Sequence, residues 1–196
     1  MPFQFRYPTL DDADMLLEWR MRPEITRFMF TDLETTDPAR QRAWLEACAR
    51  RDDVCHCIIS HDGQPVGYLS YSGIDHVHRR AASGSYLADG TGTARRRLAG
   101  FLYPFIFDYA FVRLNLHKLV NSFMAGNTRV IAVQRALRLR EVGTLREHIF
   151  KNGAWHDVTL FELLRAEWEG RPRLFPLEHT LAAFPPRPPS CQPVPL

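Results

Sequence analysis

Two runs rich in β-forming residues flank an Asp-Gly pair, and this feature most restricts the fold. The run VCHCIIS at residues 54–60 and the run PVGYLSYSGI at residues 65–74 are joined by the turn HDGQ. Because an Asp-Gly pair suits the left-handed backbone of a tight turn, the two runs are predicted to form a hairpin. The apolar segment at residues 97–111 is long enough for a buried helix. The chain is therefore predicted to pack helices against a sheet.

The other segments show either strand or helix periodicity. Further strands are predicted at residues 3–7, 79–88 and 117–124, and two more on either side of the turn at 151–153. Further helices are predicted at residues 10–20, 38–50 and 127–139, the last of them capped by Asn127. The predicted order of elements is βααβββαβαββ.

Length and composition indicate one globular domain followed by a tail. A chain of 196 residues with 45% apolar and 24% charged residues can bury one substantial core. From residue 171 to residue 196, eight of the residues are proline, which argues against regular helix or sheet there. We therefore predict a domain at residues 1–170 and an extended or loosely packed proline-rich tail at residues 171–196.

Charge and cysteine usage restrict the partners and the compartment. The net charge of +3 and the pI near 8.8 suit an anionic small molecule but not the dense basic face that duplex binding requires, so nucleic acid is not expected. No apolar run approaches the roughly 20 residues that span a bilayer, so no membrane association is expected. Without a disulfide framework or a leader segment, a reducing cytoplasm is the expected location. The four cysteines are Cys48, Cys55, Cys57 and Cys191.

The triplet Cys55-His56-Cys57 resembles a metal site at first sight. We expect its two cysteines to point to opposite faces of a strand, and no second cluster completes a tetrahedral set of ligands. The triplet is therefore interpreted as core cysteine, and no metal is predicted.

Several motifs resemble those of the GCN5-related N-acetyltransferases (GNAT). The segments LNLHKL, N-x-R at Asn127–Arg129, EVGTLREHIFKNG and H-D-V are similar to the C-terminal half of that superfamily, within the branch of ribosomal-protein and amino-sugar acetyltransferases. The pattern L-x-E-W-R-x-R-P-E-I followed by F-M, at Leu16–Met29, is similar to enzymes of the pseudaminic acid route that acetylate a UDP-linked 4-amino sugar. These motifs cover about residues 5–165. The resemblance implies an α+β fold in α/β/α layers, with a mixed sheet splayed between its fourth and fifth strands and helices on both faces.

The resemblance also implies a site for acetyl-CoA beside the basic segment GTGTARRRLAG at residues 90–100. In the family, amide groups of the loop after strand four and the start of the next helix hold the pyrophosphate. Arg97 stands where the family has a glycine, and the alternative is a solvent-facing basic turn; for Asn127 the alternative is a purely structural cap. The implied cofactor-binding residues are Leu87, Ala88, Arg95, Arg96, Arg97, Leu98, Ala99, Gly100 and Asn127.

The implied chemistry is direct attack of a neutral amine on the thioester. The main-chain N–H of Leu87 would receive the developing oxyanion. Gln134 replaces the tyrosine that protonates the thiolate in many relatives, and an amide is no acid near neutral pH. His76 and His78 are the candidate bases, and the alternative for each is an exposed loop residue.

The implied acceptor is a small-molecule primary amine, with an amino sugar nucleotide as the leading candidate. Protein N-termini and an amine metabolite or antibiotic stay open as acceptors. A non-catalytic acyl-CoA-binding domain also stays open, and Gln134, Arg97 and Ala82 would favour it. The sequence does not fix the oligomeric state, and a homodimer stays open.

Trp19 could equally be a core residue, and Arg20 could form a surface ion pair. The implied acceptor-binding residues are Trp19, Arg20, Met29, Phe30 and Tyr86.

Overall fold

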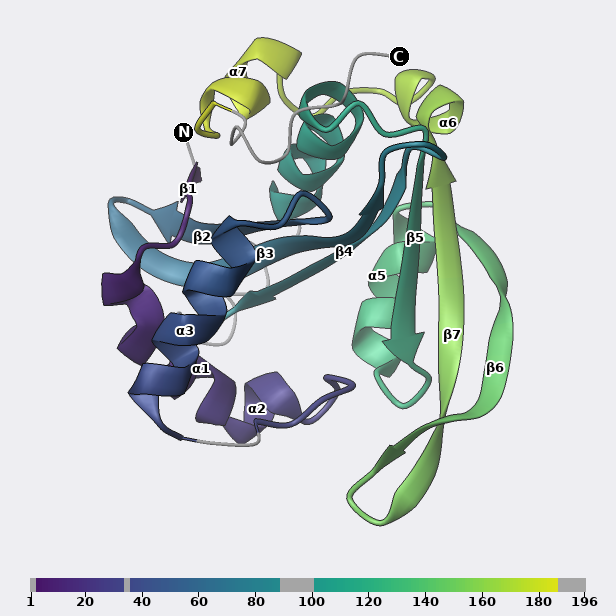
Figure 1. Cartoon of the computed structure of the whole chain (residues 1–196). Coiled ribbons are helices and arrows are strands. Elements are labelled where there is room, and N and C mark those ends of the chain that lie inside the picture. Colours follow the sequence, from purple (N-terminus) through teal and green to yellow (C-terminus); the bar gives the residue numbers. More distant parts are fainter. Residues whose placement is uncertain (1–2, 34–35, 89–100, 187–196) are drawn as a thin grey trace.

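The computed structural model describes residues 3–33, 36–88 and 101–186, and these form a layered α/β/α fold around one sheet (Figure 1). Within the described ranges the strand order is β1-β2-β3-β4-β5-β7-β6. The β4–β5 pair is parallel and the other pairs are antiparallel, so the sheet is mixed as predicted. The strands are β1 (Gln4–Arg6), β2 (Val54–His61), β3 (Gln64–Asp75), β4 (Arg80–Leu87), β5 (Lys118–Met124), β6 (Arg140–Lys151) and β7 (Ala154–Leu164).

The helices occupy the predicted positions, with additions. Residues 101–108 are helical and continue into the π-helical turn η2 (Tyr109–Arg113). The turn η1 lies within the helix predicted at residues 10–20, whereas the short helices α2, α6 and α7 were not part of the predicted order. The other helical elements are η1 (Leu10–Asp12), α1 (Ala13–Met21), α2 (Pro23–Thr26), α3 (Pro38–Ala49), α5 (Thr128–Ala136), α6 (Arg165–Glu169) and α7 (Leu177–Ala182).

The two faces of the sheet bury two separate cores. Ile58 of β2 lies in the smaller core, which α1, α2 and α3 cover with residues such as Leu16 and Leu45. Cys57 of the same strand lies in the larger core, which includes residues of the helix at 101–113, α5 and α6. Adjacent residues of a strand point to opposite faces, so each strand serves both cores. This arrangement confirms the predicted layers.

Both predicted tight turns are present. Asp62 and Gly63 have φ angles of 50° and 76° between β2 and β3, where His61 pairs with Gln64. Asn152 and Gly153 have φ angles of 51° and 77° between β6 and β7. Positive φ at both central residues is what a two-residue hairpin turn requires, and Asn-Gly and Asp-Gly adopt it at low cost.

The prediction for the two strand cysteines is wrong. Residues two apart on a strand point to the same face. Cys55 and Cys57 accordingly both lie in the larger core, while His56 lies on the other face and stacks with Tyr68. Among the described residues, no group of three or more His, Cys, Asp or Glu side chains is arranged to hold a metal ion.

The prediction that residues 171–196 contain no regular helix is also wrong within the described part. Helix α7 begins directly after Pro176, a position where proline's fixed φ is compatible with helix entry. Phe184 is buried and stacks on Phe5 with ring centroids 3.9 Å apart. The Phe5 N–H donates to the Ala183 carbonyl at 2.8 Å. Residues 171–186 therefore pack onto the larger core instead of forming a loose tail, and residues 187–196 lie outside the described ranges.

Candidate active site

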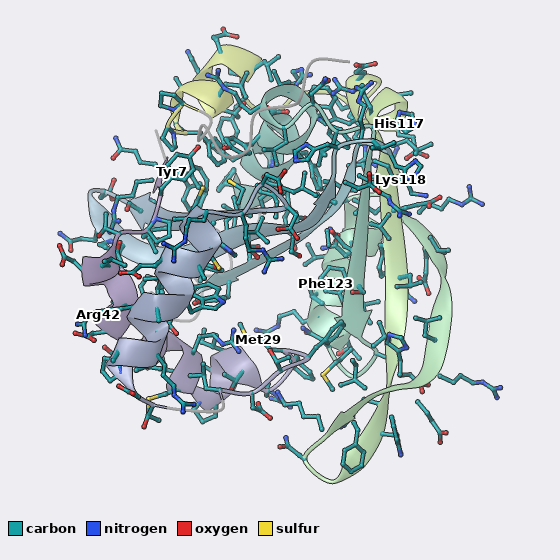
Figure 2. All side chains as sticks on the ribbon, viewed as in Figure 1. Tyr7, Met29, Arg42, His117, Lys118 and Phe123 are labelled. Atoms are coloured by element: carbon teal, nitrogen blue, oxygen red, sulfur yellow. The ribbon has the colours of Figure 1, made fainter. Side chains whose placement is uncertain are left out.

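Strands β4 and β5 pair at one end only. Their Cα register contains Arg80 with Lys118 and Ala81 with Leu119, and no further pair. Figure 2 labels Lys118 at the paired end of β5 and Phe123 toward its other end, where the two strands separate. The sheet is therefore splayed between its fourth and fifth strands, as the sequence resemblance implied.

Asn121 marks the point at which the strands diverge. Two residues further along the same register, Ser83 would face Asn121, but there the Asn121 side chain takes the place of the β5 main chain. Its Oδ1 accepts from the Ser83 N–H at 2.8 Å, and its Nδ2 donates to Ser83 Oγ at 3.1 Å. Asn121 is 3% exposed. Its amide oxygen gives the Ser83 N–H an acceptor that the splay of the two strands would otherwise take away. Sequence reasoning missed this residue, although a lone Asn within an apolar strand was the available signal.

Leu87 lies at the open end of β4, and its N–H faces the divergence. Main-chain N–H groups point alternately to the two sides of a strand. The Ala88 N–H donates to the Val66 carbonyl on β3 at 2.8 Å, whereas the Ser83 N–H points toward β5. Leu87 is an even number of residues from Ser83, so its N–H shares that direction. The Ala88 carbonyl accepts from Arg22 at 3.0 Å, so both main-chain groups of Ala88 are already engaged.

Gln134 of α5 is fully buried and meets a tyrosine of another helix. Its Nε2 donates to the Tyr103 hydroxyl oxygen at 3.0 Å. Its Oε1 has no hydrogen-bond partner among the described residues. Asn127 caps the same helix by accepting from the Val130 N–H at 3.4 Å. The capping alternative for Asn127 is therefore present, and its role toward a cofactor stays a prediction.

The predicted phosphate loop cannot be placed. Residues 95–100, which carry the arginine triplet, lie outside the described ranges. The described chain resumes with the helix at residues 101–108, whose Tyr103 meets Gln134.

Three of the predicted acceptor residues, Trp19, Met29 and Tyr86, pack in the smaller core. Trp19 is 2% exposed and lies edge-on to Tyr86, with ring centroids 6.2 Å apart. Arg20 donates from Nη2 to the Thr31 carbonyl at 3.1 Å, and its Nε is buried without a partner among the described residues. Met29 packs against the same core. Trp19 is thus a core residue that supports Tyr86, while the Arg20 Nε–H is buried without an acceptor among the described residues. Phe30 is half-buried in the segment after α2.

The segment after α2 bridges the two halves of the sheet, and we call residues 26–32 the strap (Figure 1). Lys151, at the β6–β7 turn, donates to the Thr26 and Met29 carbonyls at 2.8 Å each and pairs with Asp32 at 2.7 Å. Its side chain is 3% exposed. Phe28 approaches Gly126, which follows β5. Sequence reasoning missed Lys151, because a lysine in a hairpin turn normally points to solvent.

His76 and His78 lie at the far end of β4 from Leu87. The His78 N–H donates to Asp75, and the His76 ring contacts the Asp52 carbonyl at 3.0 Å. Both histidines precede Arg80, so seven further strand residues, about 23 Å of chain, separate them from Leu87. The structure places neither histidine near Leu87, so it does not support either one as a base for a reaction there.

Comparison with known proteins identifies the fold. The sequence family described as acetyltransferase (GNAT) domain matches residues 3–140. The chain belongs to this family. The enzyme class is therefore N-acetyltransferase, and GNAT acetyltransferases use acetyl-CoA as the acyl donor. In this chain β4 and β5 diverge beyond Ala81 and Leu119, and the buried Gln134 Oε1 has no partner among the described residues.

Relatives within the GNAT family differ in their named acceptors. The chain is 32% identical over 116 residues to YdaF of Bacillus subtilis, named as a candidate ribosomal N-acetyltransferase, covering 56% of this chain and 59% of YdaF. It is 29% identical to the uncharacterized N-acetyltransferase p20 of Bacillus licheniformis, covering 82% and 92% of the two chains. It is 31% identical to the spermidine N(1)-acetyltransferase of Escherichia coli K12, covering 52% of this chain and 53% of that enzyme.

Solved structures show the same fold. The spermidine N-acetyltransferase of Vibrio cholerae in complex with CoA and spermine superposes with a TM-score of 0.76 at 20% identity. The match covers 86% of this chain and 99% of that chain.

No helix among the described residues has the length and apolar character needed to cross a bilayer.

An aromatic row on the smaller-core face of this GNAT domain includes a buried histidine. His56 Nδ1 and the Tyr68 hydroxyl share a hydrogen bond at 2.5 Å, and Tyr68 stacks on Tyr86 with centroids 5.5 Å apart. Burial, with a smaller contribution from Arg51, lowers the pKa of His56 to about 4. Burial raises the pKa of Tyr86 well above its ordinary value, so Tyr86 stays a neutral phenol at physiological pH.

The depressed pKa of His56 predicts loss of stability in acid. As the pH falls below about 6.5, His56 takes up a proton in the unfolded chain but stays neutral in the folded one until about pH 4. Because the unfolded chain binds this proton and the folded chain does not, the free energy of unfolding should fall by about 2–3 kcal/mol between pH 7 and pH 4.5. Urea unfolding of His56→Phe should show a smaller pH-dependent loss than the wild type. The exposed His148, changed to Gln, is the control, and an equal loss in His56→Phe and wild type would refute the assignment.

Proposed function

We propose that the protein transfers the acetyl group of acetyl-CoA to the primary amine of an amino sugar nucleotide, of the UDP-4-amino-4,6-dideoxy sugar type. The observation that carries this proposal is the Arg20 Nε, which is buried beside the tyrosines of the smaller-core face and has no partner in the part of the chain that the structure describes. A buried guanidinium N–H without a partner is costly, so a ligand acceptor for it is expected.

The environment of Arg20 suits a diphosphate joined to a sugar. The guanidinium is fixed at one end by the Thr31 carbonyl, so the rest of its donor fork is held in place. Its charge also favours ionisation of the Tyr86 and Tyr68 hydroxyls, although burial dominates and raises the pKa of both. Arg20 is therefore close to both phenols, whose rings can pack on a sugar or base.

The reaction follows from the groups on either side of the divergence. Acetyl-CoA, when bound, supplies the activated acyl group. The Leu87 N–H points to the side where the acyl carbonyl would lie and would stabilise negative charge on its oxygen. Asn121 and Ser83 close the inner end of the splay. Holding acceptor and donor in one site supplies the proximity that a bimolecular reaction lacks. The loop at residues 95–100 is proposed to hold the phosphates of the donor.

The charges on the acceptor side distinguish this acceptor from a polyamine. Glu18 of α1 and Asp32 of the strap are two carboxylates on this side that already pair with a cation. Glu18 pairs with Arg22 at 2.7 Å, and Asp32 pairs with Lys151 at 2.7 Å. A polyamine would need unpaired carboxylates, whereas a diphosphate needs an available guanidinium such as Arg20. We therefore expect weaker activity with spermidine than with the sugar nucleotide.

An Arg20→Met variant tests the anion site. With the UDP-amino sugar, kcat/KM should fall about tenfold to a hundredfold, the value of one charged hydrogen bond. The KM for acetyl-CoA should stay unchanged, because Arg20 is assigned to the acceptor. The measurement is release of the CoA thiol with the sugar nucleotide, spermidine and a peptide N-terminus as acceptors. Arg50→Met, an exposed arginine after α3, is the matched control.

Two outcomes would contradict the proposal. The acceptor assignment fails if spermidine or the peptide is acetylated and the sugar nucleotide is not. The assignment of acetyltransferase activity fails if isothermal titration shows tight binding of acetyl-CoA while none of the amines causes release of the CoA thiol. That result would indicate a binding domain without activity.

A further inference from the structure

Breaking a thioester leaves a thiolate, which becomes the free thiol only when it gains a proton. We propose that Tyr103, held by Gln134, donates its proton to the sulfur of the departing CoA. The two residues come from the two helices that follow β4 and β5, so their hydrogen bond joins the helices on either side of the splay. The inference rests on acyl transfer from a CoA thioester and is independent of which amine is the acceptor.

The unpaired oxygen of Gln134 indicates that a ligand reaches this depth. Gln134 is 0% exposed, and its Oε1 has no partner among the described residues while its Nε2 is bonded to Tyr103. Leaving a buried carbonyl oxygen unpaired costs about 1–3 kcal/mol, so a donor from a bound molecule is expected there. The arm of CoA carries an amide N–H two methylene carbons from its sulfur. If that N–H bonds Gln134, the sulfur lies within reach of the neighbouring Tyr103 hydroxyl.

The direction of the hydrogen bond leaves the Tyr103 proton free. The Tyr103 oxygen accepts from Gln134, so its own O–H can donate elsewhere. Burial raises the pKa of Tyr103, and the bond from Gln134 partly offsets this rise. Tyr103 is therefore protonated at neutral pH, and Gln134 makes it a better acid than an equally buried phenol without that donor.

The step balances in atoms and charge. The acceptor nitrogen forms a bond to the acyl carbon, and the carbon–sulfur bond breaks with its electron pair on sulfur. The Tyr103 proton passes to that sulfur and gives the free thiol. The nitrogen loses one proton to solvent, and solvent returns one to the Tyr103 oxygen. Gln134 exchanges no proton and acts as a positioning residue.

Kinetics with two acyl donors test the role of Tyr103. Tyr103→Phe keeps the ring that packs near Phe107 and removes only the hydroxyl. With acetyl-CoA, kcat should fall at least about tenfold. With an acetyl thioester of a more acidic thiol, which leaves without a proton donor, the variant should approach the wild-type rate. Loss of kcat with both donors would indicate a structural role and would overturn the proposal, as would an unchanged kcat with acetyl-CoA.

Binding gives a second readout that needs no turnover. Isothermal titration should show that the wild type binds CoA about threefold to fivefold more tightly than desulfo-CoA, the factor that one hydrogen bond supplies. This preference should disappear in Tyr103→Phe and shrink in Gln134→Leu. Tyr7→Phe, which removes a hydroxyl bonded to the Pro186 carbonyl, should retain it. A preference that survives in Tyr103→Phe overturns the proposal.

The two readouts separate this inference from the proposed function. If the wild type acetylates a different amine, the acceptor assignment fails while the Tyr103 comparison stands with that amine. If no amine is acetylated, the preference for CoA over desulfo-CoA still decides whether Tyr103 meets the sulfur.

Discussion

Replacing Asp108 by alanine is expected to lower the unfolding free energy by about 3–5 kcal/mol, because it breaks a buried charged cluster. The Asp108 side chain is 5% exposed and accepts hydrogen bonds from Trp168 at 2.9 Å, Arg173 at 2.9 Å and Thr180 at 2.5 Å. Alanine would leave the buried Trp168 N–H without an acceptor and Arg173 without its partner charge, while the Thr180 hydroxyl could still donate to the Leu177 carbonyl. The C-terminal segment would lose its polar attachment to the helix at residues 101–113 and keep the aromatic contacts of Phe175 with Phe105 and of Phe184 with Tyr109.

Thermal and urea unfolding measure the effect of Asp108→Ala. The expected loss corresponds to a fall in Tm of about 6–20 °C for a domain of this size. Asp108→Asn keeps the shape and one acceptor, so its loss should be smaller. Asp53→Ala is the surface control, because the Arg51–Asp53 pair is more than 40% exposed on both sides and should contribute less than about 1 kcal/mol. Equal losses in Asp108→Ala and Asp53→Ala would disprove the role of the cluster.

Replacing Lys151 by methionine is expected to detach the strap and lower kcat/KM for the acceptor about a hundredfold. Lys151 supplies charged hydrogen bonds to the Thr26 and Met29 carbonyls, each of which contributes about 1.5–3 kcal/mol. Methionine fills a similar volume but cannot donate. Because the strap carries the proposed acceptor residues Met29 and Phe30 together with the Thr31 carbonyl that holds Arg20, the acceptor site should lose its shape. The KM for acetyl-CoA should change little.

Hydrogen exchange tests the Lys151 prediction without an assay of activity. Amide protection at residues 26–32 should fall in Lys151→Met, while that of β2 and β3 should not. Lys118→Met is the matched control, since Lys118 pairs with Glu162 at 2.5 Å near the paired end of β5. Unchanged protection of the strap in Lys151→Met would refute its anchoring role, whatever the kinetics show.

Much of the fold could be predicted because its signals are local. The turns at Asp62–Gly63 and Asn152–Gly153 follow from the φ preferences of two adjacent residues. The capping of α5 by Asn127 follows from a side chain and an N–H three residues apart. Pro176, in contrast, was interpreted from proline content alone, although a proline at a helix entry is compatible with the helix that follows it.

The candidate site was only partly predictable, because its contacts join distant parts of the chain. Arg20 and Tyr86 were identified from motif positions. Lys151 was not, since its carbonyl partner Met29 lies 122 residues away and nothing near Lys151 in the sequence signals burial. Tyr103 belongs to an apolar helix segment, where a tyrosine is normally interpreted as a core residue. Only its contact with Gln134 distinguishes it from the other aromatic residues of that helix.

The amino-acid sequence by itself determined the order of strands and helices, the two tight turns and the cap of α5, because short-range φ preferences and side-chain periodicity act between neighbours. The tertiary structure alone decided that Asn121 closes the splay, that Gln134 meets Tyr103 and that Lys151 holds the strap. These contacts depend on where β4 and β5 separate, and that point is set by the packing of both cores at once.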